Sequence, residues 1–142
     1  MANATMRKFG YPDSLVHEFD HWAALVRPAQ VTLGSLVLVA RSEATAYSDL
    51  PPEAFAEQGV AIRRIESALR DFSNYERINY LMLMMVDREV HFHVVPRYSG
   101  SRDWEGIEFP DSGWPGPPQL KLVFDLNSSQ LSSMRNQLKS VF

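Results

Sequence analysis

Glu89-Val90-His91-Phe92-His93-Val94-Val95-Pro96-Arg97 is a stretch in which ionisable and apolar side chains alternate. Successive side chains of a β-strand point to opposite faces, so the alternation predicts a strand over residues 89–95 that Pro96 ends. Glu89, His91 and His93 then share one face, and the opposite face carries Val90, Phe92 and Val94. The Cα atoms of the two histidines are expected about 6.6–7 Å apart.

A face with two histidines and a carboxylate suits two kinds of chemistry. A neutral imidazole is a good nucleophile near pH 7, and a second imidazole can donate a hydrogen bond to a phosphate oxygen. Alternatively, Glu89, His91 and His93 can supply ligands to zinc or iron, although neighbouring residues of one strand rarely complete a coordination shell alone. A solvent-facing strand with ordinary polar residues is the third interpretation.

The composition excludes several classes of protein. The 142 residues suffice for one domain, and the absence of Cys excludes disulfide frameworks, thiol nucleophiles and iron–sulfur clusters. The net charge of −3 gives no reason to expect binding to a nucleic acid polymer. Residues 1–12 lack the apolar core of a signal peptide, and residues 81–86 are too short to span a membrane, so a cytoplasmic protein is expected. The other histidines, His17 and His21, are interpreted as structural or surface residues.

We expect three segments: an N-terminal lead-in over residues 1–15, polar and mobile over 1–12, a core over 16–98, and a C-terminal loop, strand and helix over 99–142 that pack on the same domain. Apolar side chains at helical spacing predict a helix over 52–72, which Ser48 or Asp49 caps. Further expected elements are strands within 16–26, 36–40, 78–86 and 120–126, a tight turn at 87–88, a long loop over 99–118, and a final helix capped by Asn127 or Ser128. Met82, Met84 and Met85 are assigned to the core. This order predicts an α+β domain with a mostly antiparallel sheet.

The stretch from Glu89 to Arg97 resembles the signature of the histidine triad (HIT) superfamily of nucleotide hydrolases and transferases. That signature is His-φ-His-φ-His-φ-φ, where φ is apolar, often followed by Pro-Arg. His91 and His93 match its second and third histidines. The surrounding pattern of Arg27-Pro28, Gly34 before an apolar strand, and Leu50-Pro51 before a long helix is also similar. The resemblance covers roughly residues 16–98, and the Trp114-Pro115-Gly116 loop resembles, more weakly, the extended tail of some bacterial members.

The resemblance implies a five-stranded antiparallel sheet with a long helix and a C-terminal helix, in a homodimer. It implies hydrolysis or transfer at the α-phosphate of a dinucleoside polyphosphate or nucleoside phosphoramidate, without metal or cofactor. His91 would be the nucleophile that forms a nucleotidyl-histidine, and His93 would position the phosphate. The residues assigned to nucleotide binding are Asn79, Arg97 and, near the base and ribose, Phe19 and Trp22.

Two positions depart from the pattern of the superfamily. Glu89 stands where the signature has its first histidine, and Ser35 stands where many members have a histidine. The Glu89 carboxylate can orient an imidazole and raise its basicity, but its charge disfavours an approaching phosphate. The alternative hypothesis is therefore a non-catalytic nucleotide-binding module of the same fold.

Overall fold

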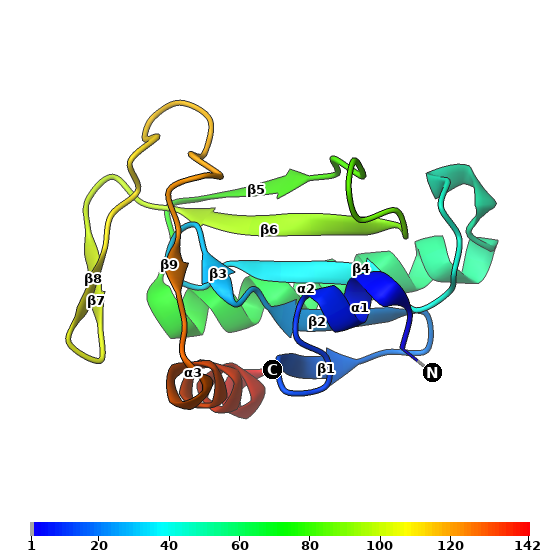
Figure 1. The fold of residues 1–142 in the computed structure, drawn as a ribbon, viewed down its shortest axis with the longest axis horizontal. Helices are drawn as coiled ribbons and strands as arrows, with labels where there is room; N and C mark the ends of the chain where they lie inside the picture. Colours follow the sequence, from blue (N-terminus) through cyan, green and yellow to red (C-terminus); the bar gives the residue numbers. More distant parts are fainter. Residues whose placement is uncertain (1) are drawn as a thin grey trace.

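The structure, a computed structural model, describes residues 2–142 and is built on a five-stranded antiparallel sheet (Figure 1). The strand order is β1-β2-β4-β6-β5. These strands are β1 (Leu15–Glu18), β2 (Trp22–Val26), β4 (Leu36–Ala40), β6 (His91–Arg97) and β5 (Arg77–Leu81). The expected α+β class and five-stranded antiparallel sheet are confirmed.

The central strand β4 determines which way the histidines face. All five of its residues are buried, as its continuously apolar sequence predicts. Its antiparallel register with β6 places Val39 opposite His91 and Val37 opposite His93. Opposed residues share a face, so both histidines lie on the face that carries Val37 and Val39.

Two helices cover the other face of the sheet. The helix α2 (Pro52–Ser73) lies behind the sheet in Figure 1, within one residue of the expected end. Its N-cap is Pro51, with no side-chain cap, so the expected cap at Ser48 or Asp49 is wrong; both residues lie in the 3₁₀ turn η1 (Tyr47–Asp49). The helix α3 (Ser128–Val141) has the expected cap at Asn127, reinforced by a capping box with Gln130.

A short helix, α1 (Ala4–Lys8), covers the histidine face, in front of the sheet in Figure 1. Met6 is fully buried and Phe9 nearly so, and both pack on the sheet in a cluster with Ala23, Leu25, Val37 and Val39. The Asn3 side chain caps the helix and also donates to the carbonyls of Ala40, at 2.7 Å, and Ser42, at 2.8 Å. The expectation of a mobile lead-in is therefore wrong for these residues.

The Met-rich segment does not continue the sheet. The expected strand over 78–86 ends at Leu81, because the backbone pairing with β6 stops where Leu81 meets His93. Residues 82–90 then form a loop instead of a tight turn at 87–88, with Met84 at a φ of 51°. Met82 and Met84 pack against the core as expected, but Met85 is 83% exposed, so the assignment to the core is wrong for Met85. The strand β6 begins at His91, not Glu89, and continues through Pro96 to Arg97.

Three other segments differ in detail from the expectation. Residues 16–26 form a hairpin of β1 and β2 in place of one strand. The expected loop over 99–118 contains the hairpin of β7 (Arg102–Trp104) and β8 (Ile107–Phe109). Of the strand expected over 120–126 only β9 (Phe124–Asp125) forms, paired with β3 (Ala29–Gln30). Within residues 2–142, no helix has both the length and the apolar character needed to cross a membrane.

Candidate active site

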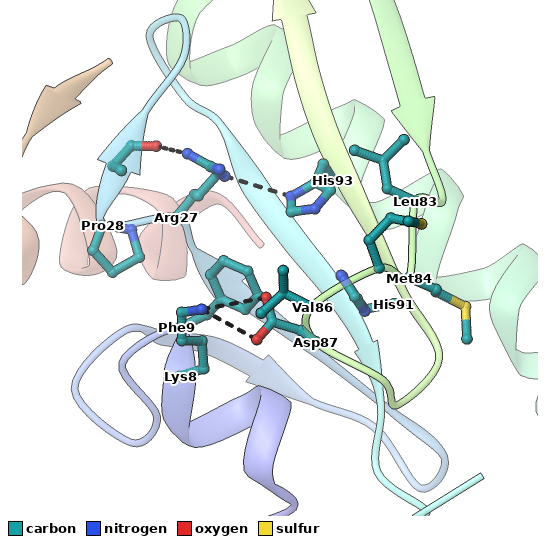
Figure 2. A pocket seen from close by; sticks show the side chains of 12 residues that line it. Lys8, Phe9, Arg27, Pro28, Leu83, Met84, Val86, Asp87, His91 and His93 are labelled. Carbon is teal, nitrogen blue, oxygen red and sulfur yellow. Dashed lines mark hydrogen bonds and ion pairs between the residues drawn. The ribbon is translucent and has the colours of Figure 1, made fainter. Parts of the chain in front are cut away.

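His91 and His93 line a cavity of about 380 Å³ between the sheet, the end of α1 and the loop 82–90 (Figure 2). Their ring centroids are 5.1 Å apart, with the two planes nearly perpendicular. The Phe9 ring lies 5.9 Å from the His91 ring and 5.7 Å from the His93 ring. The expected shared face therefore brings both imidazoles to one cavity, and α1 supplies its apolar wall.

The His91 ring is held in one tautomer. Its Nδ1 lies 2.7 Å from the backbone oxygen of Glu89. A carbonyl oxygen only accepts hydrogen bonds, so Nδ1 carries the hydrogen and the neutral ring has its free lone pair on Nε2. His91 is 2% exposed and lines the cavity. The main-chain contact at Nδ1 thus leaves the lone pair on Nε2 unused.

The His93 ring is held in the opposite sense. Arg27 Nε donates to His93 Nδ1 at 3.4 Å, so the hydrogen of the neutral ring is on Nε2. Burial, with further contributions from the charges of Arg27 and His91, lowers the pKa of His93 to about 4. The ring is therefore neutral at pH 7, and its Nε2–H is a hydrogen-bond donor.

The Glu89 carboxylate points to α1 and is not among the groups that line the cavity. Its Oε1 accepts from the backbone nitrogen of Thr5 at 3.0 Å and from Thr5 Oγ1 at 2.7 Å. Glu89 therefore contacts the His91 ring through its main-chain carbonyl, while its side chain anchors the helix. Because the carboxylate is hydrogen-bonded to Thr5 outside the cavity, its negative charge disfavours a phosphate in the cavity less than the sequence suggests.

Three charged side chains line the cavity: Lys8, Arg27 and Asp87. Lys8 Nζ lies 3.2 Å from Asp87 Oδ1 and links α1 to the loop 82–90, as Figure 2 shows. Arg27 also donates to the Ala29 carbonyl, and its guanidinium lies 6.0 Å from the centre of the Phe9 ring. The excess of one positive charge favours an anionic ligand.

Asn79 and Arg97 lie at the other end of the same sheet face and do not line this cavity. Arg97 is 4% exposed and forms two hydrogen bonds with the Asp111 carboxylate, at 2.7 and 3.0 Å. Its Nη1 donates to Asn79 Oδ1 at 2.7 Å. Both residues border a second cavity, of about 610 Å³, beside Trp114.

The other residues expected near the nucleotide are also elsewhere. Trp22 is fully buried against α2, where its Nε1 donates to the Ala54 carbonyl at 2.7 Å. The Phe19 ring packs on His17, 4.5 Å between centroids, and His17 stacks on Phe142. His21 borders a separate surface pocket. Ser35 exchanges hydrogen bonds with Thr32 in the turn before β4.

The described residues contain no group of three or more His, Asp or Glu side chains arranged to hold a metal ion. Four residues that build the cavity are absent from the site expected from the sequence, namely Lys8, Phe9, Arg27 and Asp87. The sequence marks Arg27 only through the Arg27-Pro28 pair. Lys8 and Phe9 carry no signal, because they lie in a segment with the pattern of a polar lead-in.

Solved structures resemble this chain over nearly its full length. A histidine triad protein from Sinorhizobium meliloti superposes with a TM-score of 0.77 and 16% identity, covering 100% of this chain and 96% of that one. A histidine triad protein from Bradyrhizobium japonicum gives 0.74 and 17%, with 99% and 96% covered. Plasmodium falciparum diadenosine triphosphate hydrolase gives 0.68 and 13%, with 91% and 76% covered.

Comparison with protein-family models and with curated proteins finds no match. The likeness, at identities of 13–17%, therefore lies in the fold. This chain has the fold of the histidine triad (HIT) proteins.

Proposed function

We propose that this protein hydrolyses a nucleotide phosphoanhydride or phosphoramidate, or transfers its nucleotidyl group, through a covalent nucleotidyl-His91. The observation that carries the proposal is the 2.7 Å contact between His91 Nδ1 and the Glu89 carbonyl, which leaves the Nε2 lone pair free in the cavity. Dinucleoside polyphosphates and nucleoside phosphoramidates are the proposed substrate classes. One solved structure of the same fold is a diadenosine triphosphate hydrolase.

In the first step, Nε2 of His91 attacks the α-phosphorus and the bond to the leaving group breaks with its electron pair. His93 donates a hydrogen bond from Nε2 to a phosphate oxygen. It is not the source of the leaving group's proton, because its Nδ1 already accepts from Arg27 and loss of the Nε2 proton would leave an imidazolate. An amine leaving group therefore takes its proton from solvent.

In the second step, water attacks the phosphorus, the Nε2–P bond breaks, and a proton returns to solvent. Splitting one displacement into two lowers the barrier of each. Positioning by the buried rings and the hydrogen bond from His93 provide the catalysis. No step requires a metal.

The test is hydrolysis of adenosine 5′-phosphoramidate and diadenosine tetraphosphate by wild type and His91→Ala. We expect turnover by wild type, a loss on the order of 1,000-fold or more in the variant, and a mass increase of one adenylyl group on His91 after rapid quenching in alkaline denaturant, in which the N–P bond is stable. His21→Ala is the matched control, because it removes a histidine from a separate pocket. Wild type and His91→Ala with equal rates, or no adduct, contradict the proposal.

A non-catalytic nucleotide-binding module is the second candidate. It is favoured by the side chains of Leu83, Met84, Met85 and Val86, which line the cavity without offering a hydrogen-bond donor to a phosphate. On this hypothesis, adenosine monophosphate raises the melting temperature of the protein, and neither substrate is turned over. Turnover that His91→Ala abolishes excludes it.

We also propose a homodimer. The strand β5 is an edge of the sheet, so one side of its backbone is free to pair with a second copy. Sedimentation velocity measures the oligomeric state directly. A monomer across the micromolar range contradicts this part of the proposal.

A further inference from the structure

The rim of the histidine cavity exposes apolar side chains to an unusual degree. Met85 is 83% exposed, Val86 is 82% exposed and Leu83 is 49% exposed, and all three also line the cavity. Clustered exposed apolar residues on a soluble domain mark a surface that contacts something else. They line the same cavity as His91 and His93, and Figure 2 shows Leu83 and Val86 beside it.

The loop that carries these side chains is attached near its C-terminal end and at its middle. At its end, Asp87 pairs with Lys8 of α1, and Val90 donates from its backbone to the Ala44 carbonyl at 3.1 Å. Met84, in the middle, is packed against the core with a left-handed φ of 51°, which a non-glycine residue adopts at an energetic cost. The exposed side chains are therefore presented by a held loop.

We propose that Leu83, Met85 and Val86 form a subsite for an apolar leaving group, so that the preferred substrates are nucleoside phosphoramidates whose nitrogen carries an alkyl chain. The inference rests on the proposed function. In an N-alkyl phosphoramidate, the His91 Nε2–P bond forms and the P–N bond breaks. The alkylamine leaves with the electron pair and takes a proton from solvent.

The size of the cavity indicates which part of the substrate meets the rim. At about 380 Å³ it is near the lower end of ligand pockets, so a nucleotide fills it. Its interior wall is already apolar, with Phe9 8% exposed beside the imidazoles. The substituent on the far side of the phosphorus therefore extends past the rim, where methionine and valine can cover it.

The experiment measures chain-length dependence separately in binding and in turnover. Isothermal titration gives Kd values for the O-ethyl and O-hexyl esters of adenosine 5′-phosphate, and kcat/KM is measured for the N-ethyl and N-hexyl phosphoramidates. Each half-buried methylene is expected to improve affinity about twofold, so hexyl binds about 15-fold more tightly than ethyl in wild type. In M85S/V86S the ratio is expected to fall to about twofold or less.

Leu122→Ser is the matched control, because it removes an apolar side chain that is 60% exposed outside this cavity, and it should keep the wild-type ratio. Equal affinities for the two esters in wild type, or an unchanged ratio in M85S/V86S, overturn the subsite. A dimer that M85S/V86S converts to monomer also overturns it, because a second copy then covers the rim. Chain-length-dependent binding without turnover keeps the subsite and rejects the proposed function, whereas turnover without chain-length dependence does the reverse.

Discussion

The two ends of β6 carry ionisable side chains on the same sheet face, yet they are satisfied very differently. At one end, the Arg97 guanidinium donates three hydrogen bonds to Asp111 and Asn79. At the other end, His91 and His93 each use Nδ1 alone, and Nε2 of each has no protein partner among the described residues. Both rings line the cavity, so their unused Nε2 atoms suit this end of the strand to a ligand.

The comparison separates stability from chemistry along a single strand. Arg97 and Asp111 are 4% and 2% exposed at their side chains, so their mutual contacts replace water completely. The histidines are also nearly buried, but beside a cavity that a substrate can enter. Burial alone does not distinguish the two ends, whereas the count of unused donors and acceptors does.

The largest effect on stability is expected at the paired end. Asp111→Ala leaves the buried Arg97 charge without a partner and removes the acceptor of the Tyr98 backbone nitrogen. We expect the free energy of unfolding in urea to fall by about 3–5 kcal/mol. His91→Ala removes one hydrogen bond beside an existing cavity and should cost about 1 kcal/mol. Equal losses from the two variants break the comparison.

The second effect is the pH dependence caused by His93. Its pKa is about 4 in the folded protein, chiefly because of burial, and about 6.5 in the unfolded chain. The unfolded state therefore binds more protons between these values, and the free energy of unfolding falls as the pH drops from 6.5 to 4, by about 3 kcal/mol.

The pKa of His17 is also lowered, by burial and then by Arg64 and Lys139, so it contributes a pH dependence of the same sign. The difference between wild type and His93→Gln isolates His93. Urea melts across this pH range should show a shallower dependence in the variant. A His93 titration midpoint near 6.5 by NMR contradicts the assigned burial.

A third, smaller effect tests the dual role of Glu89. Glu89→Ala removes the acceptor of both Thr5 hydrogen bonds but leaves the carbonyl that orients His91. We expect about 2 kcal/mol of destabilisation, because the lost bonds are charge-assisted. In activity, KM should rise more than kcat falls, since α1 forms a cavity wall.

Glu89→Gln keeps an acceptor for Thr5 and should recover part of the loss. Thr5→Val removes only the hydrogen bond from the hydroxyl, so it should lower the free energy of unfolding by less than Glu89→Ala does. A double-mutant cycle that shows no coupling between positions 5 and 89 contradicts a stabilising interaction between Thr5 and Glu89.

The features that the sequence predicts correctly are those in which apolar residues recur at the regular spacing of a strand or a helix. The alternation around His91 and His93 was sufficient to place both rings on one face, because parity does not depend on where a strand begins. Helical spacing located α2 within a residue. In residues 82–86 an apolar sequence does not correspond to burial, because Met85 and Val86 are exposed at the cavity rim.

The missed parts depend on contacts between segments far apart in the chain. The five residues of α1 are too few to be helical alone, and the helix is held by Asn3 to Ala40 and Thr5 to Glu89. Arg27 reaches His93 across 66 positions. No local pattern encodes such pairs, so the tautomers of the two histidines emerged only with the fold.

The smallest expected effect is at Lys8 and Asp87, the ion pair that joins α1 to the loop 82–90. The Lys8 side chain is 55% exposed, so water and salt screen the attraction, and a double-mutant cycle should give a coupling of about 0.5 kcal/mol. The coupling should disappear at high salt. A coupling above about 2 kcal/mol that persists at high salt contradicts this, because it requires the pair to be desolvated. The histidine end of β6 would then also carry a buried ion pair, and it would no longer differ from the Arg97 end in this respect.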